Sequence, residues 1–300
     1  MTTNIRVILE REHLEHLLPL LEREGVTDEI IETITEPDLK SLGVEKFGER
    51  RRLLLAFADG AGGPFDLTAM AQVGGGLLPQ DSEFSGKKVE PFRIGKYPVT
   101  QIEWERVRIW ATGHGFKLED GEGNGSRHPI TQVSWYDAIK WCNAKSAMEG
   151  LAPVYSINGK IYQNGEYGPD GSTLVEMNPK ADGYRLPTEV EWEWAARGGP
   201  LSQGYQFSGS DNPDQVAWHE KNSDGVTHPV GQKQPNELGI HDMSGNVWEW
   251  CWDKDETGPA CRIRGGSWMQ LDGHVTVAYR VSRSPDSRYT VIGFRIARNL

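Results

Sequence analysis

Apolar residues recur every three or four positions in the first part of the chain. Two groups have this spacing: Leu14, Leu17, Leu18 and Leu21, and then Ile30, Ile31 and Ile34. The pattern predicts short amphipathic helices. Thr35 is placed to cap a helix that begins at Pro37, and Gly43 ends that helix. Gly48 precedes a last, longer helix with an apolar face at Leu53, Leu54 and Phe57.

From residue 92 onward, an alternating pattern gives way to capped helices. Phe92, Ile94 and Tyr97 alternate as the residues of a half-buried strand do. Three amphipathic runs then follow hydroxyl residues that act as N-caps: Thr100, Ser134 and Thr188.

The helix expected after Thr188 carries several glutamates. Glu191 stands at the third helical position, where it completes a capping box with Thr188. A pair of catalytic carboxylates is the alternative. We favour the structural interpretation, in which one glutamate closes the cap and another pairs with a buried Arg185 or Arg197.

Composition changes sharply near residue 60. Residues 8–58 are rich in Leu, Ile, Glu and Arg, whereas residues 64–300 hold all eleven tryptophans. The run DGAGGP, at 59–64, is typical of a helix stop and a linker. We therefore predict a helical domain at 8–58, a linker at 59–88 and a second domain at 89–300.

The charge balance disfavours two classes of partner. The net charge is −11, so we expect neither nucleic acid nor an anionic membrane as a partner. No apolar run approaches the ~20 residues of a membrane span, and the first residues lack a secretory pattern. Three scattered cysteines suit a reducing cytoplasm. Cys142, in a helical pattern, is expected to be a buried apolar residue.

The first domain resembles a sterile-alpha-motif (SAM) domain. Five expected short helices ending in LGV…GERRRLLLAF carry the resemblance over about residues 8–58. SAM domains mediate protein association, so the resemblance implies self-association or binding of another SAM-like domain. That mode needs an acidic and a basic surface, for which the candidates are Glu32, Glu36 and Asp38, and Arg50, Arg51 and Arg52. The alternative is that these charges lie on solvated helix faces.

Four segments of the second domain carry another resemblance: GYRLPTEVEWEWAARGG, GIHDMSGNVWEW, RGGSW and GFRIAR. Together they resemble the formylglycine-generating (sulfatase-modifying) enzymes, whose C-type-lectin-like fold implies an α+β domain here. Those enzymes bind copper through two cysteines just after RGGSW. The matching positions here are Gln270 and Val275. Because only a thiol supplies that chemistry, we predict a protein that is not an enzyme.

The same resemblance implies a calcium site in GIHDMSGNVWEW. The matching ligands are Asp242 and Glu249 by side chain, and Gly245 and Val247 by backbone carbonyl. Hard oxygen donors on a turn that contains glycine suit Ca²⁺. The alternative is a polar turn in which Asp242 and Asn246 accept backbone amides.

Residues 268–298 resemble the variable region of diversity-generating retroelement variable proteins, which share this fold and end in GFR(I/L/V)AR. Their randomised AAC codons cannot encode Lys, Glu, Gln, Met or Trp. About six such residues are expected in thirty, and Leu271 to Leu300 contains none. Met269 and Gln270 break the rule and would arise otherwise. The candidate ligand-binding positions are Met269, Gln270, Leu271, Gly273, His274, Thr276, Tyr279, Val281, Ser282, Ser284, Ser287, Tyr289, Thr290 and Val291.

Such a segment binds a protein or another macromolecule if its variable side chains are exposed. Aromatic residues among small polar ones resemble an antibody paratope. The residues beneath them are called the frame. Trp268, Val277, Ile292, Phe294 and Ile296 are expected to be buried, and Arg280 and Arg295 to make buried or half-buried hydrogen bonds.

Two alternatives to a diversified binding surface remain. In one, Leu271, Val281 and Val291 are core residues of a degenerate family member. In the other, the chain is an enzyme of the same superfamily with altered chemistry, such as an iron-dependent sulfoxide synthase. That chemistry needs a metal-binding set of histidines, and the histidines here are scattered.

Overall fold

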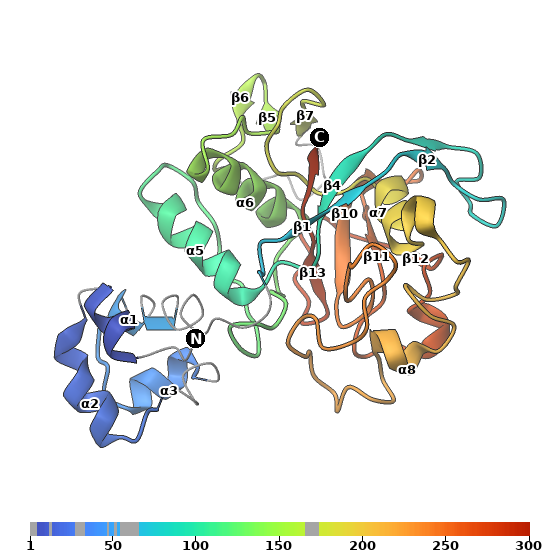
Figure 1. Ribbon diagram of the computed structural model, residues 1–300. Coiled ribbons are helices and arrows are strands. Elements are labelled where there is room, and N and C mark those ends of the chain that lie inside the picture. The colour runs from blue at the N-terminus through green and yellow to red at the C-terminus, as the bar shows by residue number, and fades with distance from the viewer. Residues whose placement is uncertain are drawn as a thin grey trace.

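The computed structural model describes residues 5–11, 14–27, 34–46, 48–50, 53–54, 66–165 and 174–300. Figure 1 shows a small helical domain near the N-terminus and a larger domain of helices and strands. Several residues named above lie outside the described residues: Ile30, Ile31, Glu32, Arg51, Arg52 and Phe57. The side chain of Glu36 is also outside them.

Short helices around an apolar core make up the small domain. Its elements are α1 (Ile5–Arg11), η1 (Glu15–Leu17), α2 (Leu18–Arg23) and α3 (Glu36–Ser41), and residues 48–50 and 53–54 are also helical. Leu14, Leu21 and Leu53 are fully buried together, which confirms the predicted helical spacing where it is described. Thr35 caps α3 in a capping box with Asp38, as predicted.

Arg50 does not belong to the basic surface that the sequence predicted. Its guanidinium is buried, and its Nη1 donates to the carbonyl oxygens of Val44 and Glu45 at 2.7 and 2.6 Å. These carbonyls belong to the turn before the last helix, so Arg50 holds that turn in place. The prediction of Arg50 as a surface residue is therefore wrong.

Two sheets form the centre of the larger domain. The first, in the order β1-β4-β14, contains β1 (Met70–Val73), β4 (Phe92–Gly95) and β14 (Ala297–Asn299). The second, in the order β12-β11-β10-β13, contains β12 (Arg280–Arg283), β11 (Cys261–Arg264), β10 (Trp248–Lys254) and β13 (Ile292–Phe294). Only β13 runs parallel to its neighbour in this second sheet.

Smaller strand groups lie around these sheets. They are β2 (Gly76–Leu77) with β3 (Lys88–Val89), β5 (Tyr155–Ile157) with β6 (Lys160–Ile161) and β7 (Glu176–Met177), and β8 (Ala217–Trp218) with β9 (Ser244–Gly245). Together with the helices, they confirm the predicted α+β class.

The predicted linker at 59–88 is wrong over much of its described part. Met70–Val73 forms β1, whose register pairs Ala71 with Ile94 and Val73 with Phe92. Ala71 and Val73 are buried in the same apolar cluster as β4. A strand of four residues carries little periodicity of its own, and its pairing with β4 stabilises it. The larger domain therefore begins at or before Met70.

Three helices of the larger domain begin where the sequence predicted. α5 (Gln101–Thr112), α6 (Trp135–Met148) and α7 (Glu189–Ala196) follow Thr100, Ser134 and Thr188, each with a complete capping box. Glu191 closes the cap of α7 and also pairs with Arg185 at 2.7 Å, so its structural interpretation is confirmed. The shorter helical turns are η2 (Gly199–Leu201), α8 (Pro213–Val216) and η3 (Asp272–His274). Among the described residues, no helix is long and apolar enough to cross a membrane.

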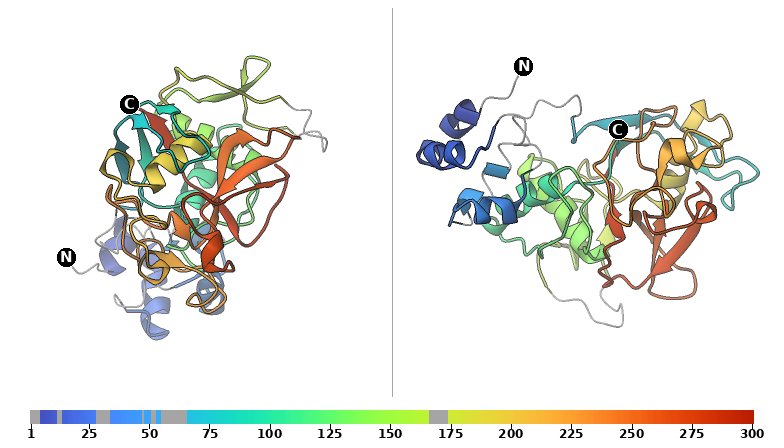
Figure 2. Two further views of the ribbon diagram at one scale, coloured as in Figure 1. Left: turned by 90° about the vertical axis from the view of Figure 1, so that its right-hand side faces the viewer. Right: turned by 90° about the horizontal axis from the view of Figure 1, so that it is seen from below.

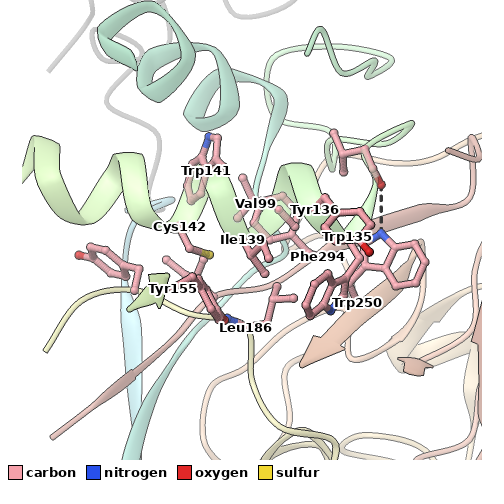
Figure 3. Close-up of a cluster of buried hydrophobic side chains, with 14 of the residues drawn as sticks. Val99, Trp135, Tyr136, Ile139, Trp141, Cys142, Tyr155, Leu186, Trp250 and Phe294 are labelled. Carbon is pink, nitrogen blue, oxygen red and sulfur yellow. Dashed lines mark hydrogen bonds between the residues drawn. The ribbon is translucent and has the colours of Figure 1, made fainter. Parts of the chain in front are cut away.

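Aromatic side chains fill the core between α5, α6 and the second sheet (Figure 3). Trp141 stacks on Trp104 with ring centroids 6.2 Å apart, and Phe294 meets both rings edge-on. Cys142 is fully buried among them, and burial raises the pKa of its thiol. The prediction of Cys142 as a buried apolar residue is confirmed.

The small domain lies beside α5 (Figure 1). The views in Figure 2 agree that β11, β12 and α8 lie on the opposite side of the larger domain. The helical domain and the strand that carries part of the predicted variable region are therefore far apart.

We predict that Glu103 makes stability fall as pH rises. Burial raises the pKa of this carboxyl to about 7, against the attraction of Lys145 and the hydrogen bonds from Thr100. The folded protein therefore binds more protons than the unfolded chain between the ordinary value of 4.5 and about 7, so the free energy of unfolding decreases across that window. Glu103→Gln keeps a capping side chain and should flatten this decrease in urea unfolding at pH 5 to 8.

Glu191→Gln is the matched control for Glu103→Gln. Glu191 occupies the same position of another capping box. Although burial opposes it, the hydrogen bond from Arg185 lowers the pKa of Glu191. Its replacement should therefore reduce stability at pH 8. An equal loss in both variants would show that Glu103 acts only as a cap.

Candidate functional site

One buried arginine joins the elements that carry the predicted variable region. Arg264, at the end of β11, has no exposed surface, and its Nη1 lies 3.0 Å from Glu189 Oε1. Its Nη2 lies 2.8 Å from Glu193 Oε2 and donates to the carbonyl oxygen of Val277 at 2.7 Å. Because a buried guanidinium has to be paired, this side chain fixes α7, β11 and the segment before β12 in one arrangement.

Ion pairs continue from this arginine toward the surface. Arg280 of β12 donates to both carboxylate oxygens of Glu189, at 2.8 and 2.6 Å, and pairs with Glu83. On the other side, Arg197 pairs with Asp81 at 2.9 Å. Residues 81–83 belong to the segment predicted as a linker, so two arginines tie that segment to the second sheet and α7.

Most of the frame is buried as predicted. Val277, Ile292, Phe294, Arg295 and Ile296 are buried, and Arg280 is half-buried in its ion pairs. Trp268 differs, because it is only half-buried, with its Nε1 3.5 Å from the carbonyl oxygen of Thr290. The chain leaves the core after the buried Ser267, one residue earlier than expected, so Trp268 as a fully buried residue is a wrong prediction.

None of the fourteen candidate ligand-binding positions is buried. Met269, Leu271 and Tyr289 are about half exposed, at 52, 53 and 50%. The remaining exposed positions are Gly273, Ser284 and Thr290, and the half-buried ones are Gln270, His274, Thr276, Tyr279, Val281, Ser282, Ser287 and Val291. Residues 269–291 thus lie mostly at the surface, with Val275 and Val277 buried among them, and the buried residues 292–296 follow directly, as a binding surface on a rigid frame requires.

Several of these positions lie close together. His274 of η3 packs against Tyr279 with ring centroids 4.6 Å apart, and Tyr279 lies 6.0 Å from Trp248 of β10. The contact between Trp268 and Thr290 brings the two ends of the variable region side by side. We call the surface of Trp268, Met269, Leu271, His274, Tyr279, Tyr289 and Thr290 the variable face.

Four candidate positions also serve the fold. Ser282 donates to Asp255 at 2.6 Å and accepts from Arg262 at 2.8 Å. Val281 and Val291 are half-buried against the largest core cluster, and so is Tyr279 of the variable face. The alternative that made these two valines core residues is therefore partly correct.

A loop outside the predicted variable region borders the variable face. Within residues 219–226, Ser223 donates to the carbonyl oxygen of Trp268 at 2.8 Å. Lys221 pairs with Asp272 at 2.5 Å. Sequence reasoning missed this loop because Ser223 and Trp268 are 45 residues apart, and no spacing along the chain links them.

The predicted calcium ligands surround a buried salt bridge. Glu249 and Arg295 have no exposed surface, and two nitrogens of Arg295 lie 2.8 and 3.0 Å from the two oxygens of Glu249. Trp192 also donates to Glu249 at 2.7 Å. Asp242 accepts from the amide of Gly231 at 2.8 Å, while its Oδ1 is buried without a hydrogen bond. Burial raises the pKa of this aspartate.

As placed, these residues do not fit a calcium ion. A cation at Glu249 would lie beside the guanidinium of Arg295 and would be repelled by it. Gly245 and Val247 are buried in the same turn, and Asn246 accepts the amide of His228 at 3.1 Å, which agrees with the polar-turn alternative. Across the described ranges, no group of three or more His, Cys, Asp or Glu could hold a metal. Calcium stays a prediction that a direct measurement tests.

The two positions that match the enzymes' cysteines have different surroundings. Val275 is fully buried in a small cluster with Phe207, Val216 and Ala217. Gln270 is half-buried beside the variable face. Neither position supplies a thiol, so the copper-binding pair of those enzymes has no counterpart at these positions.

Comparison with known families agrees with this fold. Residues 61–300 match the Sulfatase-modifying factor enzyme 1-like domain, and residues 9–59 match the SAM domain (Sterile alpha motif). The C-type-lectin-like domain thus places the protein in a class that includes both enzymes and inactive relatives. The chain belongs to the sulfatase-modifying factor enzyme 1-like family and carries an N-terminal SAM domain.

Three relatives show the range of this family. Chaperone protein LppX of Paenibacillus barcinonensis is 40% identical over 232 residues, or 69% of this chain and 80% of that protein. Inactive C-alpha-formylglycine-generating enzyme 2 of Mus musculus is 38% identical over 245 residues, or 70% and 75% of the two chains. The formylglycine-generating enzyme of Streptomyces coelicolor is 36% identical over 287 residues, or 79% and 87%.

Two solved structures have the same fold. CarF has a TM-score of 0.69 and 32% identity, covering 78% of this chain and 98% of that chain. Treponema denticola variable protein 1 has a TM-score of 0.65 and 30% identity, covering 77% of this chain and 95% of that chain.

From the salt bridge between Glu249 and Arg295, we expect calcium to leave the melting temperature unchanged. An ion bound only by the folded protein at a hundred times its Kd would add about 2.7 kcal/mol. That gain would raise the melting temperature by several degrees. Thermal unfolding in excess calcium, in EGTA and in magnesium makes the measurement. A rise that is specific to calcium would support the sequence prediction instead.

Arg264→Met should destabilise the larger domain by about 3–5 kcal/mol, because it leaves two buried carboxylates without their partner. Arg283→Met is the matched control, since Arg283 is exposed and donates only to the backbone of Ser282 among its described contacts. Urea unfolding monitored by tryptophan fluorescence compares the two. Similar losses in both variants would contradict the central role given to Arg264.

Proposed function

We propose that this protein binds a macromolecular ligand, most simply another protein, through the variable face and without catalysis. We further propose that a retroelement diversifies this surface. The observation that carries the proposal is that none of the fourteen candidate positions is buried, whereas Val277 among them and four frame residues directly after them, Ile292, Phe294, Arg295 and Ile296, are buried. Substitutions at the exposed positions can therefore change the ligand without changing the fold.

The names of three similar proteins support this proposal. Treponema denticola variable protein 1 is variable by name and has the same fold. LppX is named a chaperone, and chaperones bind other proteins. The mouse relative is named an inactive enzyme.

An enzyme of the same superfamily with altered chemistry is the alternative. Formylglycine-generating enzymes are among the relatives of this chain. In this chain, however, Gln270 and Val275 replace the cysteines, and Val275 is part of an apolar cluster. A sulfoxide-synthase chemistry needs a set of histidine ligands, and the described residues contain no group of three potential ligands. These two observations favour binding.

We also propose that the SAM domain links copies of the protein, or links it to another SAM-like domain, in the cytoplasm. Cys142, Cys251 and Cys261 are unpaired and buried, which suits a reducing compartment. Association would bring several variable faces to one ligand and raise the overall affinity by avidity.

Stability measurements test the division between surface and frame. Alanine at Met269, Leu271, Ser284 and Tyr289 should change the free energy of unfolding by no more than about 0.5 kcal/mol each. Phe294→Ala should cost about 3–5 kcal/mol, because it empties part of the aromatic core. Urea unfolding gives both values. If Tyr289→Ala cost as much as Phe294→Ala, Tyr289 would be a core residue and the proposal would be wrong.

A displayed library tests binding itself. The ten candidate positions that remain without Tyr279, Val281, Ser282 and Val291, which also contact the core or its hydrogen bonds, would be randomised on yeast. Clones would be sorted first for folding and then for binding to hen lysozyme as a probe protein. We expect most clones to fold and some to bind. A control library at Val277, Ile292 and Phe294 should lose folding. Equal loss of folding in both libraries, or no binders among folded clones, would contradict the proposal.

The retroelement has its own test in the neighbouring DNA. A near-copy of the codons for residues 268–298, with adenines at the variable positions and a reverse-transcriptase gene beside it, is the expected result. If the neighbouring DNA held no such copy, the proposed diversification would be wrong, and the variable face would be a binding surface of fixed sequence.

A further inference from the structure

A pocket of about 190 Å³ lies where the two domains meet. Ile34, Pro37 and Leu54 line it from the SAM domain, and Ile102, Glu105 and Ser126 line it from the larger domain. Four of these side chains are apolar: Ile34, Pro37, Leu54 and Ile102. They come from both domains. The two domains thus meet through apolar side chains.

α5 turns a separate stripe of side chains toward this contact. Ile102, Glu105 and Ile109 are three and four positions apart, so they share one face of the helix. Exposure changes along the stripe, because Ile102 is 8% exposed and Glu105 is 4% exposed, whereas Ile109 is 44% exposed. The part of α5 that other residues bury therefore ends between Glu105 and Ile109.

The SAM residues at this contact belong to the elements that were predicted to associate. Thr35 and Pro37 stand at the start of α3, next to the acidic candidate Asp38. Leu54 belongs to the last helix, the element that contains Arg50 and was predicted to carry the other basic candidates. A SAM domain that docks on α5 therefore has less of both elements available to a second SAM domain.

The contact is not closely packed. The pocket is partly open to solvent, and Pro37, which lines it, is exposed. Side chains around such a hollow make fewer contacts than they would in a closely packed interface. A second SAM domain can therefore compete with α5 for the same elements.

We propose that α5 and the adjoining loop at 123–126 form a docking surface for the chain's own SAM domain, and that docking opposes association between SAM domains. This proposal rests on the proposed SAM association and is independent of what the variable face binds. In the docked chain, α5 lies beside the start of α3, where Thr35 is half-buried. When another SAM domain takes that place, α5 is released.

The position of the variable face is compatible with such an exchange. β11 and β12 lie on the opposite side of the larger domain from the SAM domain, as both views in Figure 2 show. Chains joined through their SAM domains would keep β12, which follows Tyr279 of the variable face, directed away from the point of association.

Ile102→Asp tests the docking surface in the full-length protein, because it places a charge in the contact. Ile109→Asp is the matched control, at an exposed position two turns further along the same face. Small-angle X-ray scattering at low concentration measures whether the domains separate, and sedimentation equilibrium measures self-association. If docking holds about nine-tenths of the chains, its loss should lower the apparent Kd of self-association about a hundredfold, because both copies have to be undocked to associate. The control should match the wild type in both measurements.

Ser126→Trp provides a second variant, since a bulky side chain enters the contact from the loop and leaves α5 unchanged. Thermal unfolding checks that both variants stay folded. Separation of the domains without stronger association overturns the competition. Domains that stay together in both folded variants overturn the docking surface. Because the lysozyme library tests the variable face separately, neither result bears on ligand binding.

Discussion

The fold of the larger domain depends on the charge of Arg264, which is paired inside the protein with Glu189 and Glu193. A buried charge accepts few geometries, because losing one partner is costly. Apolar packing alone is more tolerant, since cores accept many substitutions of similar volume. The chain from β11 to β12 therefore follows one path, and the side chains that point away from it have little influence on that path.

Features that depend on neighbouring residues could be predicted from the sequence. Thr100, Ser134 and Thr188 bind groups three residues away, so their caps are visible in the local order of residues. β1 could not be predicted in this way, because it is held by pairing with β4. Arg50 was misjudged for a similar reason. A turn brings the carbonyl groups of Val44 and Glu45 to its guanidinium, and the position of an arginine in the sequence does not reveal such backbone partners.

The candidate site also contains features that the sequence predicted and features that depend on distant contacts. The residue types permitted at randomised codons pointed to positions that are exposed or half-buried, and none is in the core. The salt bridge between Glu249 and Arg295 spans 46 residues, so the sequence suggested a calcium ligand where the structure has an ion pair. The bordering loop at 219–226 was missed because only the tertiary fold brings it to the variable face.

The burial of Val275 has an evolutionary consequence. A cysteine restored at this position would lie among Phe207, Val216 and Ala217, surroundings as apolar as those that raise the pKa of the Cys142 thiol. Such a thiol stays protonated and does not react or bind copper readily. Cysteines at positions 270 and 275 alone would therefore not supply the copper-binding chemistry of those enzymes. Once this position is part of the core, the thiol chemistry of those enzymes is difficult to gain by point mutation.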